Sequence, residues 1–582
     1  MALFDDASLV VTPNGYKEGT LYSIKPTSGL GDMTVVRATT ATRVNSAGLV
    51  ELVPYNLVEY SQNFGNAAWS KYDVTANTSA IIAPNGNADS YVIAETNTTA
   101  VFAFDSSLTT FSANTAYTLS IYAKWDASCT RNVHLRIGNC ASSNIGASFD
   151  KNGNFVNYTG GSNGTLDSYT STDVGNGWWR FTVTVTTANV SSVGDCLAIY
   201  YLSGTTLNYA GSTTQKINWF GGQLVEGTLP KDYLRTETRL NIPRLDYSNG
   251  SCPSLLVEPQ RTNLVLYSEQ LNNTAWFGTS FITPNTTISP SGILNADTLA
   301  TTQYNNFWQG ISASTSTTYT ISLWVKLGTA TNLCLVVNNQ VSWNSIGGQS
   351  FNSANGLNTS TWTRISYTFT TPAVLPLGGI NYHIGGNAET GLTQSTGTVF
   401  IWGAQLELGS YPTSYIPTTS AAVTRNADAI YKTGISSLIG QTEGVVFIDF
   451  VWNQLTGTGS YPRIIELGNN SNNYIQLYSI AGTTTWGWDI YNGGVVQFTG
   501  SSTMALGHNK IAIGYKLNDM VIYKNGTLIA SDATCTVPAT NGLGICGTFD
   551  GTAGAQLSAS VNLAVLFPTR LTNAELAQLT TI

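Results

Sequence analysis

Two acidic residues in the last quarter of the chain are of the type that glycoside hydrolysis uses. Asp449 lies between Phe447 and Val451 on one predicted strand, and Glu466 lies on the next predicted strand. A glycosidase holds two carboxyl groups roughly 5 to 10 Å apart, one as the acid and the other as the base or nucleophile. No glutamate flanks Asp449 on its own strand, so the pair would form only if folding brought these two residues together. We therefore predict no catalytic residue, with a glycan hydrolase as the alternative.

Other reaction centres have no signature in this sequence. The chain has no G-x-S-x-G, H-E-x-x-H or phosphate-binding loop pattern, its three histidines are scattered, and its seven cysteines show no C-x-x-C spacing. We accordingly predict no cofactor and no metal site, although a calcium ion near the C-terminal end is left open. Buried free thiols are the simplest expectation for the cysteines. Spacing alone does not decide whether disulfides join Cys129 to Cys140 or Cys535 to Cys546.

Aromatic side chains are a second group with chemical potential, because a ring can stack on the face of a sugar. Trp486, Trp488 and Tyr491 flank a predicted turn at 492–494. We take these three residues as the candidate glycan-binding site. The alternative is that they belong to the core of a β-sandwich.

Most of the other large aromatic residues belong to a sequence that occurs twice. The frame N-L-V-x-Y-S, followed by N-x-A-W, begins at Asn56 and again at Asn263, and the two copies are 207 residues apart at both ends of the frame (263 − 56 = 207 and 276 − 69 = 207). Further matches follow in the same order, so the chain contains a duplicated domain. Large residues at matched positions are expected in the core; they are Trp69 and Trp276, Trp178 and Trp362, and Phe220 and Trp402.

The spacing between the copies shrinks along the duplicated unit. It is 207 residues at the first frame and 182 residues at the last matched tyrosines (415 − 233 = 182). Insertions therefore lie between matched elements, as is usual for loops. We expect the matched Arg180 and Arg364 to brace a loop. An aromatic residue that occurs in one copy only is a better ligand candidate than a matched one.

Composition and charge narrow the class of protein. Only 10% of the residues are charged, 11% are aromatic, and glycine is abundant at 56 residues. This composition favours an all-β protein. The net charge of −8 argues against binding to nucleic acid, which needs a basic surface to neutralise phosphate. The N-terminus lacks the features of a secretory signal, and no apolar run approaches the roughly 18 residues of a membrane span. We expect a soluble protein that does not insert into a membrane.

Strand periodicity and turn signals divide the chain into five parts. These are a leader or attachment segment at 1–50, a first jelly-roll repeat at 51–237, a connector hairpin at 238–258, a second jelly-roll repeat at 259–420, and a third β-sandwich at 428–582. The alternation of apolar and polar residues at 117–124 and at 179–186 predicts half-buried antiparallel strands, as in a jelly-roll sandwich. The leader is too small for a core of its own, so we expect it to pack on the first repeat or on a partner chain.

Smaller signals complete this prediction. In the third module, Asn525-Gly526 permits the positive φ angles of a tight hairpin turn within 510–529. Thr572 and Glu575 form the capping box of a closing helix. A T-R-x-N pattern at Thr42 recurs at Thr238 and, more weakly, at Thr424. Each occurrence lies beside a predicted domain boundary, so we interpret it as a joint element between modules.

Several of these motifs together resemble a module of bacteriophage tail and fibre proteins. The motifs are T-R-V-N-S-A-G-L-V-E from Thr42, P-R-L-D-Y from Pro243, L-L-V-E-P-Q-R-T-N-L from Leu255, and Y-S-E-Q with N-x-A-W up to Trp276. The sequence is most similar to virion fibre and appendage proteins of crAss-like phages, over the leader and both repeats. Through its hairpin and closing helix, the third module resembles a lectin sandwich of the laminin-G or concanavalin type.

The resemblance implies a structural protein of the virion that is not an enzyme. It implies a head or tail fibre, a homotrimer that is attached to capsid or tail proteins through its N-terminal segment. Adhesion to host-surface or mucosal glycans would be its role. The alternative is a phage depolymerase whose third module hydrolyses host glycan. A bacterial surface adhesin is a third class, which the lack of a signal peptide disfavours.

Overall fold

The computed structural model describes residues 2–582 except 108–110, 112–114, 140–144, 162–163, 189–194, 305–306, 342, 376–377, 387–390, 456–460 and 553. These residues are built almost entirely of antiparallel strands, with two short α-helices, α1 (Ala2–Asp5) and α2 (Asn573–Thr580). The chain forms two compact units. Residues 54–239 make up the smaller unit, and residues 1–53 together with 240–582 make up the larger one.

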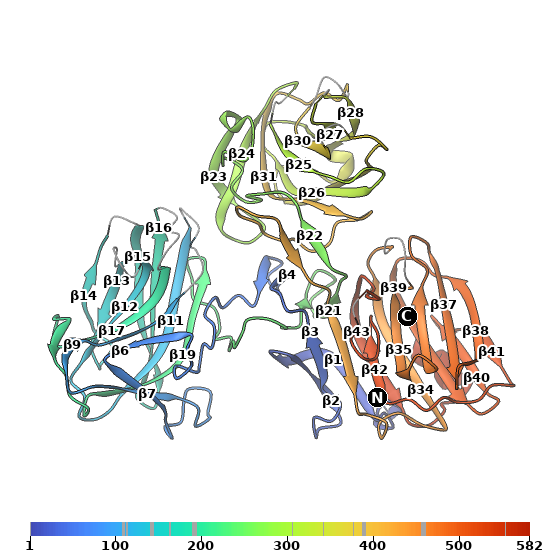
Figure 1. Ribbon diagram of the computed structural model, residues 1–582, viewed down its shortest axis with the longest axis horizontal. Coiled ribbons are helices and arrows are strands. Elements are labelled where there is room, and N and C mark those ends of the chain that lie inside the picture. Colours follow the sequence, from blue (N-terminus) through green and yellow to red (C-terminus); the bar gives the residue numbers. More distant parts are fainter. Residues whose placement is uncertain are drawn as a thin grey trace. The chain divides into compact units, whose positions relative to one another are not determined.

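The smaller unit is the first repeat, a sandwich of two six-stranded sheets (Figure 1). One sheet has the order β6 (Trp69–Tyr72), β10 (Ala103–Ser107), β17 (Asp195–Leu202), β12 (Asn132–Asn139), β13 (Ile145–Phe149) and β14 (Phe155–Thr159). The other has the order β7 (Val74–Thr78), β8 (Tyr91–Glu95), β19 (Lys216–Glu226), β11 (Ala116–Trp125), β16 (Trp178–Thr187) and β15 (Gly164–Gly175). A short pair, β9 (Thr99–Val101) and β18 (Asn208–Ala210), lies beside them. Leu119, Ile121, Phe181 and Val183 are buried in the core between the sheets, as the alternation predicts. The polar residues between them, Thr118, Ser120, Thr182 and Thr184, are buried as well, so the prediction that these strands are half-buried is wrong.

The second repeat, in the larger unit, has the same strand connectivity. Its sheets are β23 (Ile282–Ile288), β24 (Leu294–Thr301), β31 (Gly397–Leu408), β26 (Thr318–Leu327) and β29 (Thr363–Thr370), and β25 (Trp308–Ser312), β30 (Gly379–Ile384), β27 (Asn332–Asn339) and β28 (Ser345–Asn352). The strands of the first of these sheets correspond, in the same order, to β7, β8, β19, β11 and β16 of the first repeat. The strands of the second correspond to β10, β17, β12 and β13. The predicted all-β fold with tandem jelly-roll sandwiches is confirmed. Single turns of 3-10 helix, η1 (Thr279–Phe281) and η2 (Ser353–Asn355), lie outside the sheets.

Most of the difference in length between the copies comes from one insertion. The spacing between matched residues is 202 at Phe149 and Phe351 (351 − 149 = 202) but 184 at Trp178 and Trp362 (362 − 178 = 184). Strands β14 and β15 lie within this interval in the first repeat. They extend the two sheets at their edges, where added residues do not disturb the core.

The duplicated frame marks the same hydrogen bonds in each copy. Its asparagine donates two side-chain hydrogen bonds to backbone carbonyls, its tryptophan donates from Nε1 to the carbonyl nine residues earlier, and its serine shares a hydrogen bond with a tyrosine. The residues are Asn56, Trp69 and the pair Ser61–Tyr233 in the first copy, and Asn263, Trp276 and the pair Ser268–Tyr415 in the second. A buried polar group must find a partner, and each frame residue meets that requirement in the same way.

The matched residues outside the frame also behave as predicted. Trp178 and Trp402 are buried, and Trp362 is partly buried beside Trp402. Arg180 donates to the carbonyl of Lys231, and Arg364 donates to that of Thr413, so both arginines brace the segment that follows the last matched strand. These positions therefore serve the fold.

The third module is completed by strands from both ends of the chain. Its sheet follows the order β38–β37–β36–β35–β42–β33–β3–β2–β1–β43–β34–β39–β40–β41. The leader supplies β1 (Leu9–Lys17), β2 (Thr20–Lys25) and β3 (Met33–Val36), and β1 pairs with β43 while β3 pairs with β33. The expectation that the leader packs on the first repeat or on a partner chain is wrong, because both outer leader strands are paired within this module.

The module's own strands are β33 (Ala429–Thr433), β34 (Glu443–Trp452), β35 (Arg463–Asn470), β36 (Asn473–Ser479), β37 (Thr485–Asn492), β38 (Val495–Thr503), β39 (Gly507–Lys516), β40 (Met520–Lys524), β41 (Thr527–Asp532), β42 (Gly542–Ile545) and β43 (Ala559–Phe567). Asn525-Gly526, at φ 50° and 80°, forms the turn between β40 and β41. Thr572 and Glu575 form the predicted capping box of α2.

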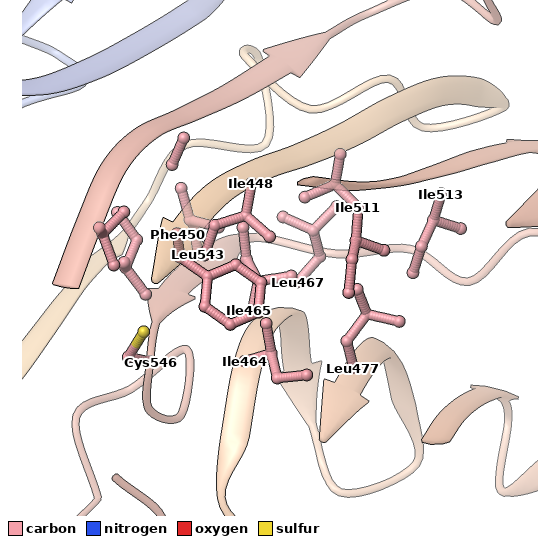
Figure 2. Close-up of a cluster of buried hydrophobic side chains, with 14 of the residues drawn as sticks. Ile448, Phe450, Ile464, Ile465, Leu467, Leu477, Ile511, Ile513, Leu543 and Cys546 are labelled. Atoms are coloured by element: carbon pink, nitrogen blue, oxygen red, sulfur yellow. The ribbon is translucent and has the colours of Figure 1, made fainter. Parts of the chain in front are cut away.

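The path of strands folds over one hydrophobic core. Figure 2 shows Ile448 and Phe450 of β34 against side chains that include Ile465 and Leu467 of β35. The leader belongs to the same core, through Leu9, Val11, Leu21, Met33 and Val35. On the other face of β34, Val445 and Phe447 pack with residues of α2. The two disulfides that the spacing left open do not form, since Cys129, Cys535 and Cys546 are free; Cys140 lies outside the described residues.

Shorter strands link the second repeat, the connector and the leader. The connector contributes β20 (Leu245–Asp246) and β21 (Ser254–Val257), and β21 pairs with β43. Strand β22 (Arg261–Asn263) pairs with β32 (Val423–Arg425), and β4 (Ala41–Val44) pairs with β5 (Val50–Val53).

Five charged side chains form a buried cluster where these segments meet; we call it the junction cluster. It consists of Arg37, Arg244, Glu258, Arg425 and Asp428. Arg37 Nη1 lies 3.0 Å from Asp428 Oδ1, and Arg244 Nη1 lies 2.7 Å from Glu258 Oε2. Arg244 also pairs with Asp428, and Arg425 pairs with Glu258. The cluster therefore joins the leader, the connector, the end of the second repeat and the start of the third module.

The three arginines hold the two carboxylates in their charged form. Burial alone would raise the pKa of Glu258, but the charges of Arg425 and Arg244 outweigh it and lower this pKa well below its usual value. The pKa of Asp428 is lowered in the same way, since Arg244 and Arg37 outweigh its burial. Burial lowers the pKa of Arg37 to about 10, although Asp428 opposes the shift.

The first test asks whether the leader belongs to the core of the third module. Leu21 of β2 is fully buried in the core of the third module, whereas Ile24 on the same strand is 45% exposed. We expect Leu21→Ala to destabilise the third module by about 2 to 5 kcal/mol, because it removes core contacts and leaves a cavity. Ile24→Ala is the matched control and should lower the free energy of unfolding by well under about 1 kcal/mol. Hydrogen exchange at the amides of β43 and β34 measures the effect. Equal protection in both variants would contradict the assignment of the leader to this core.

The second test asks whether the junction cluster stabilises the larger unit. Asp428→Asn should destabilise the larger unit by about 3 to 5 kcal/mol, because it leaves Arg37 and Arg244 as insufficiently compensated buried charges. Since the folded-state pKa values of Glu258 and Asp428 are lowered, their stabilising effect is present above the unfolded-state values near 4 and is lost as the pH falls below them. Denaturant unfolding between pH 7 and pH 3 measures both effects.

The exposed ion pair between Lys516 and Glu443 provides the control for that experiment. Its side chains are 51% and 31% exposed, so Lys516→Gln should change the unfolding free energy by no more than about 1 kcal/mol. An Asp428→Asn protein as stable as the Lys516→Gln protein would show that the junction cluster does not stabilise the unit.

Candidate functional site

The predicted site residues lie on one strand of the third module but on two different faces. Trp486, Trp488 and Tyr491 belong to β37, on which successive side chains point to opposite sides. Trp486 is fully buried and Trp488 is 4% exposed, and both belong to the hydrophobic core. Tyr491 is half-buried on the outer face.

The structure thus corrects the expectation for the two tryptophans. A sugar stacks on a ring face that solvent can reach, and the indoles of Trp486 and Trp488 pack against each other and against Phe498 inside the sandwich. Of the three predicted residues, only Tyr491 presents its ring on the outside of the sheet.

Tyr491 belongs to an ordered surface that the sequence did not single out; we call it the tyrosine face. It is the outer face of β36, β37 and β38. Three outward positions on β36 are opposite three on β37: Tyr474 opposite Tyr491, Gln476 opposite Asp489, and Tyr478 opposite Gly487. The polar row formed by Gln476 and Asp489 therefore lies between two rows that each contain tyrosine. On the adjacent strand β38, Thr499 extends the polar row.

The aromatic rings form two pairs. Tyr474 and Tyr491 are stacked with their centroids 4.9 Å apart, and Tyr461 meets Tyr478 edge to face at 5.2 Å. Gly487 provides room for the second pair, because a Cβ at that position would lie 2.7 Å from the ring of Tyr478. The Tyr478 ring can therefore lie across the neighbouring strand. Tyr461 is 57% exposed, so this edge of the surface is open to solvent.

The polar row is held by its own hydrogen bonds. Gln476 Nε2 donates to Asp489 Oδ2 at 3.1 Å, and Thr499 Oγ1 donates to Asp489 Oδ1 at 2.6 Å. Burial, with the nearby charge of Asp489, raises the pKa of Tyr478 to about 12. The pKa of Tyr474 is also raised to about 12, by burial and by the neighbouring Tyr491 and Asp489. Both phenols therefore remain protonated hydrogen-bond donors in neutral solution.

A signal for this surface was present in the sequence. In the segment 474–478 two tyrosines and a glutamine alternate with Ile475 and Leu477, which is the pattern of a half-buried strand. Ile475 and Leu477 are in the core, so Tyr474, Gln476 and Tyr478 point outward. The same reasoning applied to β37 separates Tyr491 and Asp489 from the two tryptophans.

The two carboxylates considered for catalysis do not meet. Ile448 and Phe450 point into the core, so Asp449 between them points out of it. Glu466 points out of the opposite layer, because its neighbours Ile465 and Leu467 pack into the same core (Figure 2). A sandwich core is about 10 Å thick, and both carboxylates lie beyond it on opposite sides. This arrangement does not form the pair that a glycosidase needs.

Each of these carboxylates has partners of its own. Asp449 Oδ1 accepts hydrogen bonds from His508 and from Asn562, both at 2.8 Å. Glu466 Oε2 accepts one from the backbone of Phe549. Burial raises the pKa of Glu466, although Arg463 opposes the shift. Both carboxylates therefore hold neighbouring segments together through hydrogen bonds.

Within the described ranges, His, Cys, Asp and Glu side chains do not gather in groups of three or more that could hold a metal ion. In the same part of the chain, neither helix is long and apolar enough to cross a membrane.

Comparison with known proteins gives structural matches only. No family model and no curated protein matches this sequence. The CBM40 domain of the Ruminococcus gnavus IT-sialidase, bound to alpha2,3 sialyllactose, is 18% identical with a TM-score of 0.22, over 26% of this chain and 91% of that chain. The leech intramolecular trans-sialidase is 16% identical with a TM-score of 0.20, over 25% and 24%. The NanB sialidase from Streptococcus pneumoniae is 15% identical with a TM-score of 0.22, over 25% of each chain. TM-scores of this size carry no weight for function.

The third test compares a core residue of β37 with a surface residue of the same strand. Trp486→Ala should destabilise the third module by about 3 to 5 kcal/mol, because a large buried ring is removed from the core. Tyr491→Ala should cost no more than about 1.5 kcal/mol, because it removes one stacked contact at the surface. Urea unfolding of the two variants measures the difference. Similar losses in both would contradict the assignment of these residues to core and surface.

Proposed function

We propose that this protein is a structural and adhesive component of a bacteriophage virion, a head or tail fibre that holds host-surface glycans on the tyrosine face. The proposal assigns it no catalytic step. Its adhesion comes from geometry, and multiple copies on one particle strengthen a weak contact into a lasting one.

The tyrosine face is the observation that carries the binding part of the proposal. Tyr474 and Tyr491 offer stacked rings, and Tyr478 offers a third ring beyond the polar row. Asp489 lies between them with carboxylate oxygens that can accept from hydroxyl groups, and the buried Gln476 holds that carboxylate in place. Aromatic rings beside a few fixed polar groups are a frequent composition of ligand sites.

The virion part of the proposal is supported by the motifs that resemble phage fibre proteins. Each of the tandem sandwiches is closed around its own core, as a repeated structural module requires. A homotrimer and attachment to capsid or tail proteins remain part of the proposal. The leader strands are already paired, so attachment through residues 1–50 would use exposed apolar side chains such as Tyr22, Ile24 and Leu30.

A phage depolymerase was the alternative. The residues that suggested it were Asp449 and Glu466, which lie on opposite sides of the core. Those two residues are held apart, so they do not support hydrolysis over adhesion.

The fourth test addresses glycan binding on the full-length protein. Binding to an array of bacterial capsular and mucosal oligosaccharides should be detected, and Tyr474→Ala and Tyr491→Ala should each weaken it about tenfold, since each removes one face of the stack. Tyr158→Ala in the first repeat is the matched control, because Tyr158 is also an exposed tyrosine, at 59%, on an edge strand.

Two results would overturn the proposal. Binding that is equally strong in the tyrosine-face variants and in the Tyr158→Ala control would move the glycan site elsewhere. Release of reducing ends from a bound polysaccharide would replace adhesion by hydrolysis. Immunogold labelling of intact particles tests the virion assignment, which fails if the protein is absent from purified virions.

A further inference from the structure

A second surface with the character of a binding site lies on the second repeat, on the outer face of β25, β30 and β27; we call it the tryptophan face. Its residues are Phe277, Trp308, Trp343, Asn338, Asn381 and His383. Their inward neighbours on the strands, such as Val337, Ile380 and Tyr382, are in the core. Strand pairing places Trp308 opposite His383, and Asn338 opposite Asn381.

Three aromatic rings gather at one end of this face. Phe277 stacks on Trp308 with a centroid distance of 5.1 Å, and Trp343 meets Trp308 edge to face at 5.2 Å. Trp343 also lies 6.0 Å from the ring of His383. Phe277 is 52% exposed and Trp343 is 37% exposed, which is unusual for residues of this size that have a core available nearby.

Polar atoms beside these rings have no partner. His383 is 1% exposed and neither ring nitrogen makes a hydrogen bond; Asn338 is fully buried with both amide atoms unpaired; and Asn381 Nδ2 is unpaired. Leaving a buried polar group without a partner costs about 1 to 3 kcal/mol. Burial lowers the pKa of His383 to about 4, so the imidazole is neutral in neutral solution, with one donor and one acceptor nitrogen.

Gly310 leaves room for side chains around it. It is paired with Asn381, and a Cβ on it would lie 3.1 Å from Gln340 Nε2, 3.6 Å from Asn381 Oδ1 and 3.6 Å from the Trp308 ring. The amides of Gln340 and Asn381 and the indole of Trp308 therefore converge above this glycine. The turn residue Trp343 has φ 59°, a left-handed conformation that is strained for a bulky side chain.

The first repeat shows that the fold does not require these residues. Ser70 follows the matched tryptophan in the first copy, as Phe277 does in the second. Asp105 is paired with both Ser70 and Ala198, as Trp308 is paired with Phe277 and His383. The first copy thus keeps the same strands with serine, aspartate and alanine in place of two aromatic rings and a histidine. The tryptophan face is specific to one copy.

The four strands of this sheet contain no Asp, Glu, Lys or Arg residue over their full lengths, 308–312, 332–339, 345–352 and 379–384. A charged ligand would gain no ion pair from them and would lose hydration. A hydroxyl-rich uncharged ligand matches the donors and acceptors on offer.

We propose that the tryptophan face binds an uncharged saccharide, whose ring stacks on Phe277, Trp308 and Trp343 and whose hydroxyl groups bond to His383, Asn381 and Asn338. Binding requires the side chains that cover His383, Asn381 and Asn338 to move aside, because each of these three residues is at most 1% exposed. This site is separate from the tyrosine face and does not depend on the virion assignment.

The fifth test uses the full-length protein in a Tyr474→Ala, Tyr491→Ala background, so that binding on the tyrosine face does not contribute. The probes are neutral oligosaccharides of glucose, galactose, mannose and N-acetylglucosamine, with sialylated and sulfated oligosaccharides as charged counterparts. We expect at least one neutral probe to bind in calorimetric titration. Trp343→Ala and Phe277→Ser should each weaken that binding about tenfold or more.

Phe277→Ser introduces the residue that the first repeat already carries at the matched position, so loss of folding is not expected. Leu294→Ala, at a 56% exposed position on β24 in the other sheet, is the control and should bind as the background protein does. Circular dichroism checks that all variants keep their strand content.

Several outcomes would overturn the proposal. They are the absence of binding by every neutral probe, binding that Trp343→Ala and Phe277→Ser leave unchanged, and binding of charged probes alone. In the first case the unpaired nitrogens of His383 and Asn381 would be satisfied by ordered water. Because the background lacks the tyrosine face, failure here is distinct from failure of the adhesion proposal.

Discussion

The larger unit depends on the buried ion pairs of the junction cluster. Arg244 lies between Glu258 and Asp428, while Arg37 and Arg425 complete the pairing from the leader and from the end of the second repeat. Each member is nearly inaccessible to solvent, so each is stable there only while its partners are present. Segments more than 380 residues apart in the sequence must arrive together, as the pairing of Arg37 with Asp428 illustrates. Because the cluster lies beside β3, β20, β21 and β33, it also fixes the strands that complete the third module.

Both candidate binding surfaces are built on the strands of closed sandwiches. The tyrosine face and the tryptophan face lie on the outer sides of sheets whose inner sides are closed cores. Strand alternation places every second side chain outside, so a row of aromatic and polar residues is held in register without help from a flexible loop. Sites built on strands position their groups more precisely than sites on loops. The two faces differ in charge: Asp489 belongs to one, whereas the strands beneath the other carry no charged residue.

The sequence alone predicted the features that depend on local pattern. The duplicated frame, the alternating strands, the Asn525-Gly526 turn and the cap at Thr572 each have a short-range cause, and each occurs as expected. The leader was misplaced because its pairing with β33 and β43 joins residues from opposite ends of the chain, which no local pattern records. Trp486 and Trp488 were misjudged because the nearby turn was given more weight than the alternation of the strand, which places both tryptophans with Ile490 on its apolar face. Trp308 and Phe277 satisfied the rule that aromatic residues in one copy are the better ligand candidates, but their unpaired polar neighbours appear only in three dimensions.

We infer that this chain presents ligand-binding aromatic surfaces on the outside of closed sandwiches. Hydroxyl-radical footprinting of the full-length protein, with and without a bound oligosaccharide, tests it most directly, because it reports the solvent access of each aromatic ring. We predict protection of Tyr474 and Tyr491, or of Phe277 and Trp343, according to the saccharide used, with Trp486 and Trp488 unreactive in both states. Reactive Trp486 and Trp488 in the free protein, or protection confined to residues outside both faces, would contradict the account.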